Sequence, residues 1–119
     1  MMVDMNVGYL PIVTKACTTR VRISDVMMIS RNYRKLEIKA ESGDFQYYEK
    51  LDNIAGCLGR QFYRCSDGII INFEKVECMK QQSITFSNGC RVELGRDCYL
   101  KARKAFTQYL NEQFQQYFR

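Results

Sequence analysis

The chain has 119 residues, of which 46% are hydrophobic, so it is long enough to bury one core and too short for two ordinary domains. Its 18 basic and 13 acidic residues give a formal net charge of +5, a modest excess that suits an anionic partner. The sequence lacks histidine, a glycine-rich phosphate loop, a nucleophile elbow and a paired metal-ligand motif, which argues against an enzyme and against a cofactor. We therefore expect a binding module.

The cysteines and the N-terminal segment indicate a reduced, cytoplasmic chain. The six cysteines form no CxxC pair, and several lie within apolar, strand-like runs, which is typical of small buried hydrophobic residues. Asp4 and Asn6 interrupt the N-terminal segment early and the apolar run 7–13 contains a proline, so we expect neither a targeting signal nor a membrane span. Residues 1–14 are expected to form an N-terminal arm or edge strand, and residues 15–119 the folded domain.

In the first half of the chain, alternating apolar and polar residues predict a series of strands. Short strands are expected at 19–23 and 26–29, followed by a polar, basic turn at 30–35. The turn leads into a hairpin of strands 36–40 and 45–48. This succession is typical of antiparallel β-structure.

After this hairpin the apolar residues recur at steps of three and four, which predicts a short helix at 51–58. Asp52 is expected to cap the N-terminal end of this helix. Gly59 is expected to adopt the left-handed conformation just past its C-terminal end.

The stretch 62–72 combines an aromatic pair, a polar interruption and three isoleucines, which predicts a strand, a loop and a buried strand. A loop held between two strands can present Arg64, Ser66 and Asp67 outward for recognition. An ordinary β-turn with solvated polar residues remains the alternative.

The last third of the chain contains the clearest local signal, two alternating strands at 83–87 and 90–94 around an Asn88–Gly89 turn. Apolar and aromatic residues at three- and four-residue steps then predict an amphipathic helix at about 97–118. We expect its apolar stripe to dock on the core of the domain, with a contact to a partner or a second copy as the alternative.

Together these elements resemble the LytTR-type DNA-binding domain of bacterial transcription regulators. The resemblance covers roughly residues 15–110 and is carried by the strand pair 21–29, the polar turn 30–35, the short helix 51–58, the sequence 61–72, the hairpin 84–94 and the start of the last helix at 95–99. It implies a mainly antiparallel β-domain whose loops enter successive DNA major grooves and bend the duplex. It also implies paired direct repeats as target, with two copies in contact through the C-terminal helix as a homodimer.

The resemblance further implies that base-reaching side chains come from three separate segments. By position these are Arg34 with Asn32 and Lys35, Asp67 with Ser66, and Arg96. Arginine can donate two hydrogen bonds to guanine, and each such pair is worth about 1–3 kcal/mol of discrimination. The expected phosphate contacts are Lys15, Arg20, Lys35, Arg64 and Lys101.

Two features depart from the family pattern. Asp67 stands where the family commonly has a neutral or basic residue; its carboxylate could accept from a cytosine amino group, or Arg64 could pair with it and neutralise it. Fewer than 20 residues precede the resemblance, where the family usually carries a receiver or sensor domain, so the chain is either a stand-alone regulator or an excised domain.

Two other functions stay open. The first is a LytTR-like interaction protein that has lost DNA binding and antagonises a partner regulator, which Asp67 and the small net charge would favour. The second is an RNA-binding β-module. It is disfavoured because Tyr33, Tyr47, Tyr48 and Tyr63 alternate with apolar residues as core or sheet-face positions do, without an obvious stacking row.

Overall fold

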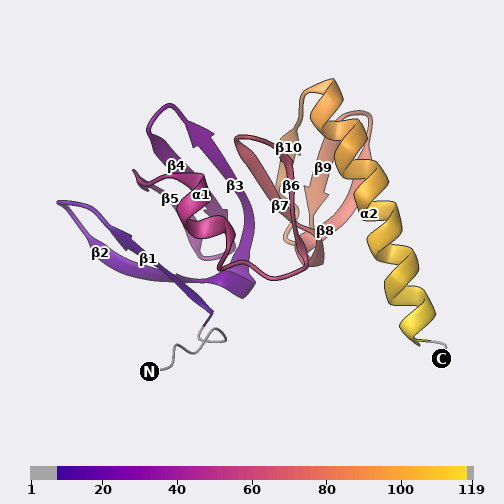
Figure 1. Ribbon diagram of the computed structural model, residues 1–119, viewed down its shortest axis with the longest axis horizontal. Helices are drawn as coiled ribbons and strands as arrows, with labels where there is room; N and C mark the ends of the chain where they lie inside the picture. The colour runs from indigo at the N-terminus through magenta and orange to yellow at the C-terminus, as the bar shows by residue number, and fades with distance from the viewer. Residues whose placement is uncertain (1–7, 118–119) are drawn as a thin grey trace.

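A computed structural model describes residues 8–117 of the chain and shows antiparallel strands in three sheets, flanked by two helices (Figure 1). The first half comprises β1 (Tyr9–Val13), β2 (Thr18–Arg22), β3 (Val26–Asn32), β4 (Lys35–Ala40), β5 (Gly43–Tyr48) and α1 (Leu51–Ala55). The second half comprises β6 (Phe62–Ser66), β7 (Ile69–Asn72), β8 (Val76–Lys80), β9 (Ser83–Phe86), β10 (Arg91–Glu93) and α2 (Arg96–Tyr117). Short 3-10 turns, η1 (Ile23–Asp25) and η2 (Phe73–Lys75), precede β3 and β8. The predicted mainly antiparallel β-fold with one short and one C-terminal helix is confirmed.

The five-stranded sheet, in the order β5-β4-β3-β7-β6, is the shared wall between two hydrophobic cores. Successive side chains of a strand point to opposite faces, so neighbouring pairs across β3 and β7 serve different cores. Ile29 pairs with Ile70 and faces the core that contains β1, β2 and α1. Met28 pairs with Ile71 and faces the core that contains β9 and α2. Burial of both faces accounts for the nearly continuous apolar runs in β3 and β7.

The apolar stripe of α2 is divided between the core and the surface. Tyr99, Ala102 and Phe106 are buried at three- and four-residue steps, as predicted for a docked amphipathic helix. Further along, Leu110 is 48% exposed and Phe114 is 63% exposed. The predicted end of the helix at 118 lies outside the described residues. None of the helices between residues 8 and 117 combines the length and the apolar character that crossing a membrane requires.

Three local predictions about the short helix are wrong. The helix α1 ends at Ala55 and not at 58, because Gly56 follows it and the chain then turns away. Asp52 does not cap it: Lys50 occupies the N-cap position without a side-chain hydrogen bond, and the Asp52 carboxylate is taken by Arg64 instead. Gly59 does not adopt the left-handed conformation expected of it, since its φ is not positive.

The hairpin turns follow from residues at the strand ends. The polar turn predicted at 30–35 is shorter, because β3 continues through Asn32 and pairs it with Lys35, leaving a two-residue turn at 33–34. The β9–β10 hairpin is confirmed. Gly89 in its turn has a φ of 91°, and the Asn88 side chain accepts a hydrogen bond from the backbone N–H of Cys90.

The cysteines contradict the prediction of reduced, buried residues. Cys65 and Cys98 are joined in a disulfide, with Cα atoms 5.3 Å apart and a sequence separation of 33. Cys17, Cys57 and Cys78 are exposed. Cysteine spacing detects only local pairs, whereas this pair forms because α2 packs against β6.

Candidate nucleic-acid interface

The three segments expected to reach bases lie along one edge of the molecule. In Figure 1 the β3–β4 turn at 33–34, the β6–β7 loop at 67–68 and the first turn of α2 all lie along the upper edge. Each is the end of a strand or helix whose body is packed in a core, so their spacing is set by the sheets. This arrangement is the one that a multi-segment contact with DNA requires.

Two direct links hold these segments together. The backbone N–H of Arg31, at the end of β3, donates a 2.8 Å hydrogen bond to the carbonyl of Gly68 in the β6–β7 loop. On the other side of that loop, the disulfide ties Cys65 of β6 to Cys98 in the first turn of α2. The central segment is therefore fastened to both of its neighbours.

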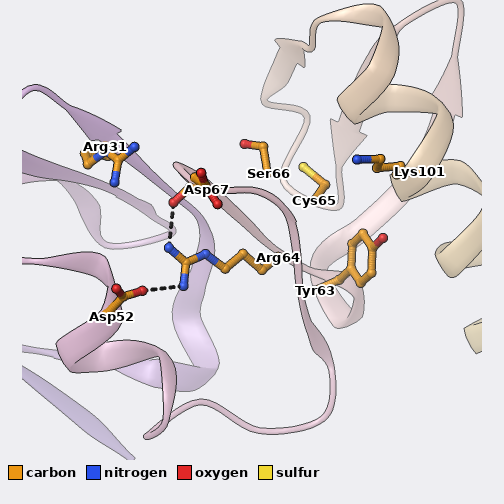
Figure 2. A pocket seen from close by; sticks show the side chains of 8 residues that line it. All are labelled: Arg31, Asp52, Tyr63, Arg64, Cys65, Ser66, Asp67 and Lys101. Carbon is orange, nitrogen blue, oxygen red and sulfur yellow. Dashed lines mark hydrogen bonds and ion pairs between the residues drawn. The ribbon is translucent and has the colours of Figure 1, made fainter.

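A polar groove of about 800 Å³ lies between these elements, and Figure 2 shows the side chains that line it. The lining residues come from β3, α1, β6, the β6–β7 loop and α2: Arg31, Asp52, Tyr63, Arg64, Cys65, Ser66, Asp67 and Lys101. The groove brings together the predicted residues Arg64, Ser66, Asp67 and Lys101. Three of the lining side chains are cationic and two are anionic, so the groove suits a partner that carries negative charge and hydrogen-bonding groups.

Arg64 is engaged inside the groove and holds the loop in place. Its guanidinium forms an ion pair with Asp52 at 2.7 Å and donates to the backbone carbonyl of Asp67 at 2.6 Å (Figure 2). The hydrogen bond from Arg64, and then its charge, lower the pKa of the Asp52 carboxyl. The expected alternative, an Arg64 pair that neutralises the Asp67 carboxylate, is wrong in detail, because Arg64 contacts the main chain of Asp67 and leaves its carboxylate exposed.

Arg34 and Arg96 are both exposed at the edge. Among residues 8–117, the ion pairs are Lys39–Asp44, Arg64–Asp52 and Lys75–Glu41, and neither arginine takes part in one. A guanidinium group in this position can form a bidentate hydrogen bond with guanine or a phosphate contact. The segments that carry them, the β3–β4 turn and the first turn of α2, lie on either side of the β6–β7 loop (Figure 1).

Asn32 and Ser66 have internal partners. Asn32 donates to the Glu37 carboxylate at 3.1 Å, and Gln46 donates to the same oxygen at 2.9 Å. The Ser66 hydroxyl accepts from the backbone N–H of Gly68 at 3.3 Å. Both side chains thus brace the segments that carry Arg34 and Asp67.

The expected phosphate contacts are spread over a longer stretch of surface. Lys15, in the β1–β2 turn, and Lys35 line a second groove of about 870 Å³ with Tyr48, whose ring lies 5.1 Å from the Lys35 Nζ. Arg20 lies within β2, with its guanidinium 4.3 Å from the ring centroid of Tyr9 on the paired strand. Lys101 lines the first groove.

Arg31 and Tyr33 were missed by the sequence reasoning. Arg31 lines the groove and its side chain lies against Gly68. Tyr33 and Tyr48, expected at core or sheet-face positions, are 95% and 72% exposed, whereas Tyr47 is buried as expected. The signal was available: continuing the strand pairing to a two-residue turn places Tyr33 at the tip of the hairpin.

Comparisons with known proteins agree with this geometry. The sequence matches the family model for the LytTr DNA-binding domain over residues 16–107. Among solved structures, the fold is similar to the LytTr DNA-binding domain of a protein described as a methyl-accepting/DNA response regulator from Bacillus cereus, with a TM-score of 0.66 and 19% identity over 84% of this chain and 96% of that chain. A comparison with curated proteins gives no match. The structural likeness supports the fold, and the family match spans most of the sequence. The chain therefore belongs to the LytTR family of DNA-binding domains.

Proposed function

We propose that the chain is a sequence-specific, double-stranded DNA-binding regulator of transcription that inserts its three edge segments into successive major grooves. The observation that carries this proposal is that the β3–β4 turn and the first turn of α2, which contain the exposed Arg34 and Arg96, lie on either side of the β6–β7 loop along one edge of a LytTR fold. The family is a DNA-binding family and not an enzyme family.

In this proposal the side chains divide into base contacts and positioning contacts. Arg34 and Arg96 read guanine, and the exposed Asp67 carboxylate accepts from a cytosine amino group. Asn32 and Ser66 sit beside them and, through their internal hydrogen bonds, fix the orientation of the contact segments. Lys15, Arg20, Lys35 and Lys101 contact phosphates, which sets position and not sequence, and Arg64 contributes mainly by holding the loop.

Two copies are proposed to bind paired direct repeats in the cytoplasm of a bacterium. The exposed second half of α2, which includes Leu110 and Phe114, is the proposed homodimer contact. Exposed apolar side chains at helical spacing support such a contact, because burial on a second copy would remove them from water.

The proposal is tested by selecting duplexes from a random pool and measuring binding by gel shift at two salt concentrations. Arg34→Ala and Arg96→Ala should each reduce the preference for the selected site by about 1–3 kcal/mol, whereas the matched control Lys15→Ala should weaken all duplexes alike. Absence of duplex binding at low salt would refute the proposal.

A second candidate function is favoured by one observation: the Asp67 carboxylate is exposed on the contact edge, where it would be repelled by the DNA backbone. We propose as the alternative a LytTR-like protein that binds no DNA and antagonises a partner regulator. If this alternative holds, adding this chain should abolish the gel shift that a DNA-binding LytTR regulator produces. The chain alone should produce no gel shift.

A further inference from the structure

Tyr33 stands at the tip of the β3–β4 hairpin, between Asn32 and Arg34. Its side chain is 95% exposed, more than any other large hydrophobic side chain in the described part of the chain. The ring therefore contributes almost nothing to the core, and its presence has no explanation in the stability of the fold. It lines a shallow surface depression of about 380 Å³ together with Arg34, Lys35 and Tyr48.

The backbone at this position is unfavourable for tyrosine. Asn32 pairs with Lys35, so the turn has two central residues, and only the first of them, Tyr33, has a positive φ, of 60°. This is the pattern of a type II′ turn, which favours glycine at its first central position. Of the other hairpin turns with positive φ, those at Gly43 and Gly89 use glycine, and the β8–β9 turn uses the polar residues Gln81 and Gln82. A large aromatic residue held in a left-handed conformation and pointing into solvent is typical of a functional position.

We propose that Tyr33 is a specificity-determining residue whose ring packs against the methyl group of thymine in the major groove. This inference rests on the proposed function, because it needs the hairpin tip to enter that groove. Among the base-pair edges of the major groove, the thymine methyl is the apolar group that an aromatic ring can cover. Arg34, the next residue, contributes hydrogen bonds, so one turn carries both a polar and an apolar contact.

The test compares thymine with uracil, which differs only by that methyl group, at each thymine position of the selected duplex. The wild-type chain should prefer thymine at one or two positions by about threefold to fourfold, the worth of one buried methyl group. Tyr33→Gly should abolish this preference and bind the thymine duplex more weakly. Its melting temperature should nevertheless rise by a few degrees, since glycine suits the turn.

Two matched variants isolate the ring of Tyr33. Tyr33→Phe keeps the ring and should retain the thymine preference. Tyr48→Ala removes the other highly exposed tyrosine, which lies on the neighbouring strand β5 beside Lys35 and lines the same depression without being part of the turn, and it should also retain the preference. A thermal melt of each variant shows that the fold is intact.

The outcomes separate the inference from the proposed function. If the wild-type chain binds duplexes but Tyr33→Gly keeps both affinity and thymine preference, the role of Tyr33 is overturned and the proposed function stands. If Tyr48→Ala loses the preference while Tyr33→Gly keeps it, the readout belongs to a different side chain and the inference is again overturned. If the wild-type chain binds no duplex, the role of Tyr33 and the proposed function are both overturned.

Discussion

Lys101→Gln should reduce the salt dependence of duplex binding, whereas Arg64→Gln should leave it almost unchanged. Both cations line the same groove, but their situations differ. Lys101 is exposed and takes no part in the ion pairs found among residues 8–117. Arg64 is already neutralised by Asp52 at 2.7 Å. The two variants, Lys101→Gln and Arg64→Gln, therefore distinguish a phosphate contact from a residue that only positions the loop.

The magnitude follows from the proposed phosphate contacts. These are Lys15, Arg20, Lys35 and Lys101, and none of them takes part in the ion pairs found among residues 8–117. If each neutralises one phosphate, the slope of log K against log salt is about −3.6, which is roughly a 150-fold loss of affinity between about 50 and 200 mM. Removing Lys101 makes the slope about −2.7 and that loss roughly 40-fold.

Fluorescence anisotropy with the selected duplex at several salt concentrations gives these slopes directly. Asp52→Asn serves as the third arm, because it releases Arg64 and should steepen the slope by up to about 0.9. Equal decreases in slope for Arg64→Gln and Lys101→Gln would refute the reasoning. That result would mean that Arg64 leaves Asp52 and contacts a phosphate on binding.

Three further predictions concern the fold that positions the edge. Asn72 is fully buried, and its side chain donates to one backbone carbonyl and accepts from one backbone N–H, so Asn72→Ala should lower the free energy of unfolding by about 2–4 kcal/mol in urea denaturation; an unchanged midpoint would contradict this account. Phe106→Ala should cost about 3–5 kcal/mol in the same assay because it opens a cavity beneath α2. Because Arg64 lowers the pKa of Asp52, their ion pair is fully formed at any pH above the ordinary pKa of a carboxyl group. It is lost only when the pH falls through the lowered pKa of Asp52. In Arg64→Gln, an NMR titration should find the Asp52 midpoint at higher pH, and an unmoved midpoint would show that the pair is absent in solution.

Most of the strands could be predicted because local periodicity determines them. The alternation in 36–40 and the Asn88–Gly89 turn each specify their structure within a few residues, and the structure confirms both. The length of α1 could not be predicted in this way. Leu58 continues the helical spacing and packs on the core, but the chain reaches it without a further helical turn.

The candidate site was predictable in its segments and not in its contacts. The order of strands and turns placed Arg34, Asp67 and Arg96 at separate element ends. The partner choices inside the site join residues far apart in sequence, such as Arg64 with Asp52, and they depend on how α1 and α2 pack against β6. A periodic pattern contains no information about such pairs, so Asp52 was assigned to the helix cap.

The bond between Cys65 and Cys98 makes a closed ring of the chain from β7 to β10. A peptide bond cut inside that ring, for example at the exposed Asn88–Gly89 turn, would nick the polypeptide without separating it into two molecules. In denaturing gel electrophoresis the nicked protein would migrate as one species until the disulfide was reduced. As long as the disulfide is intact, Arg34 and Arg96 stay in one covalently linked molecule.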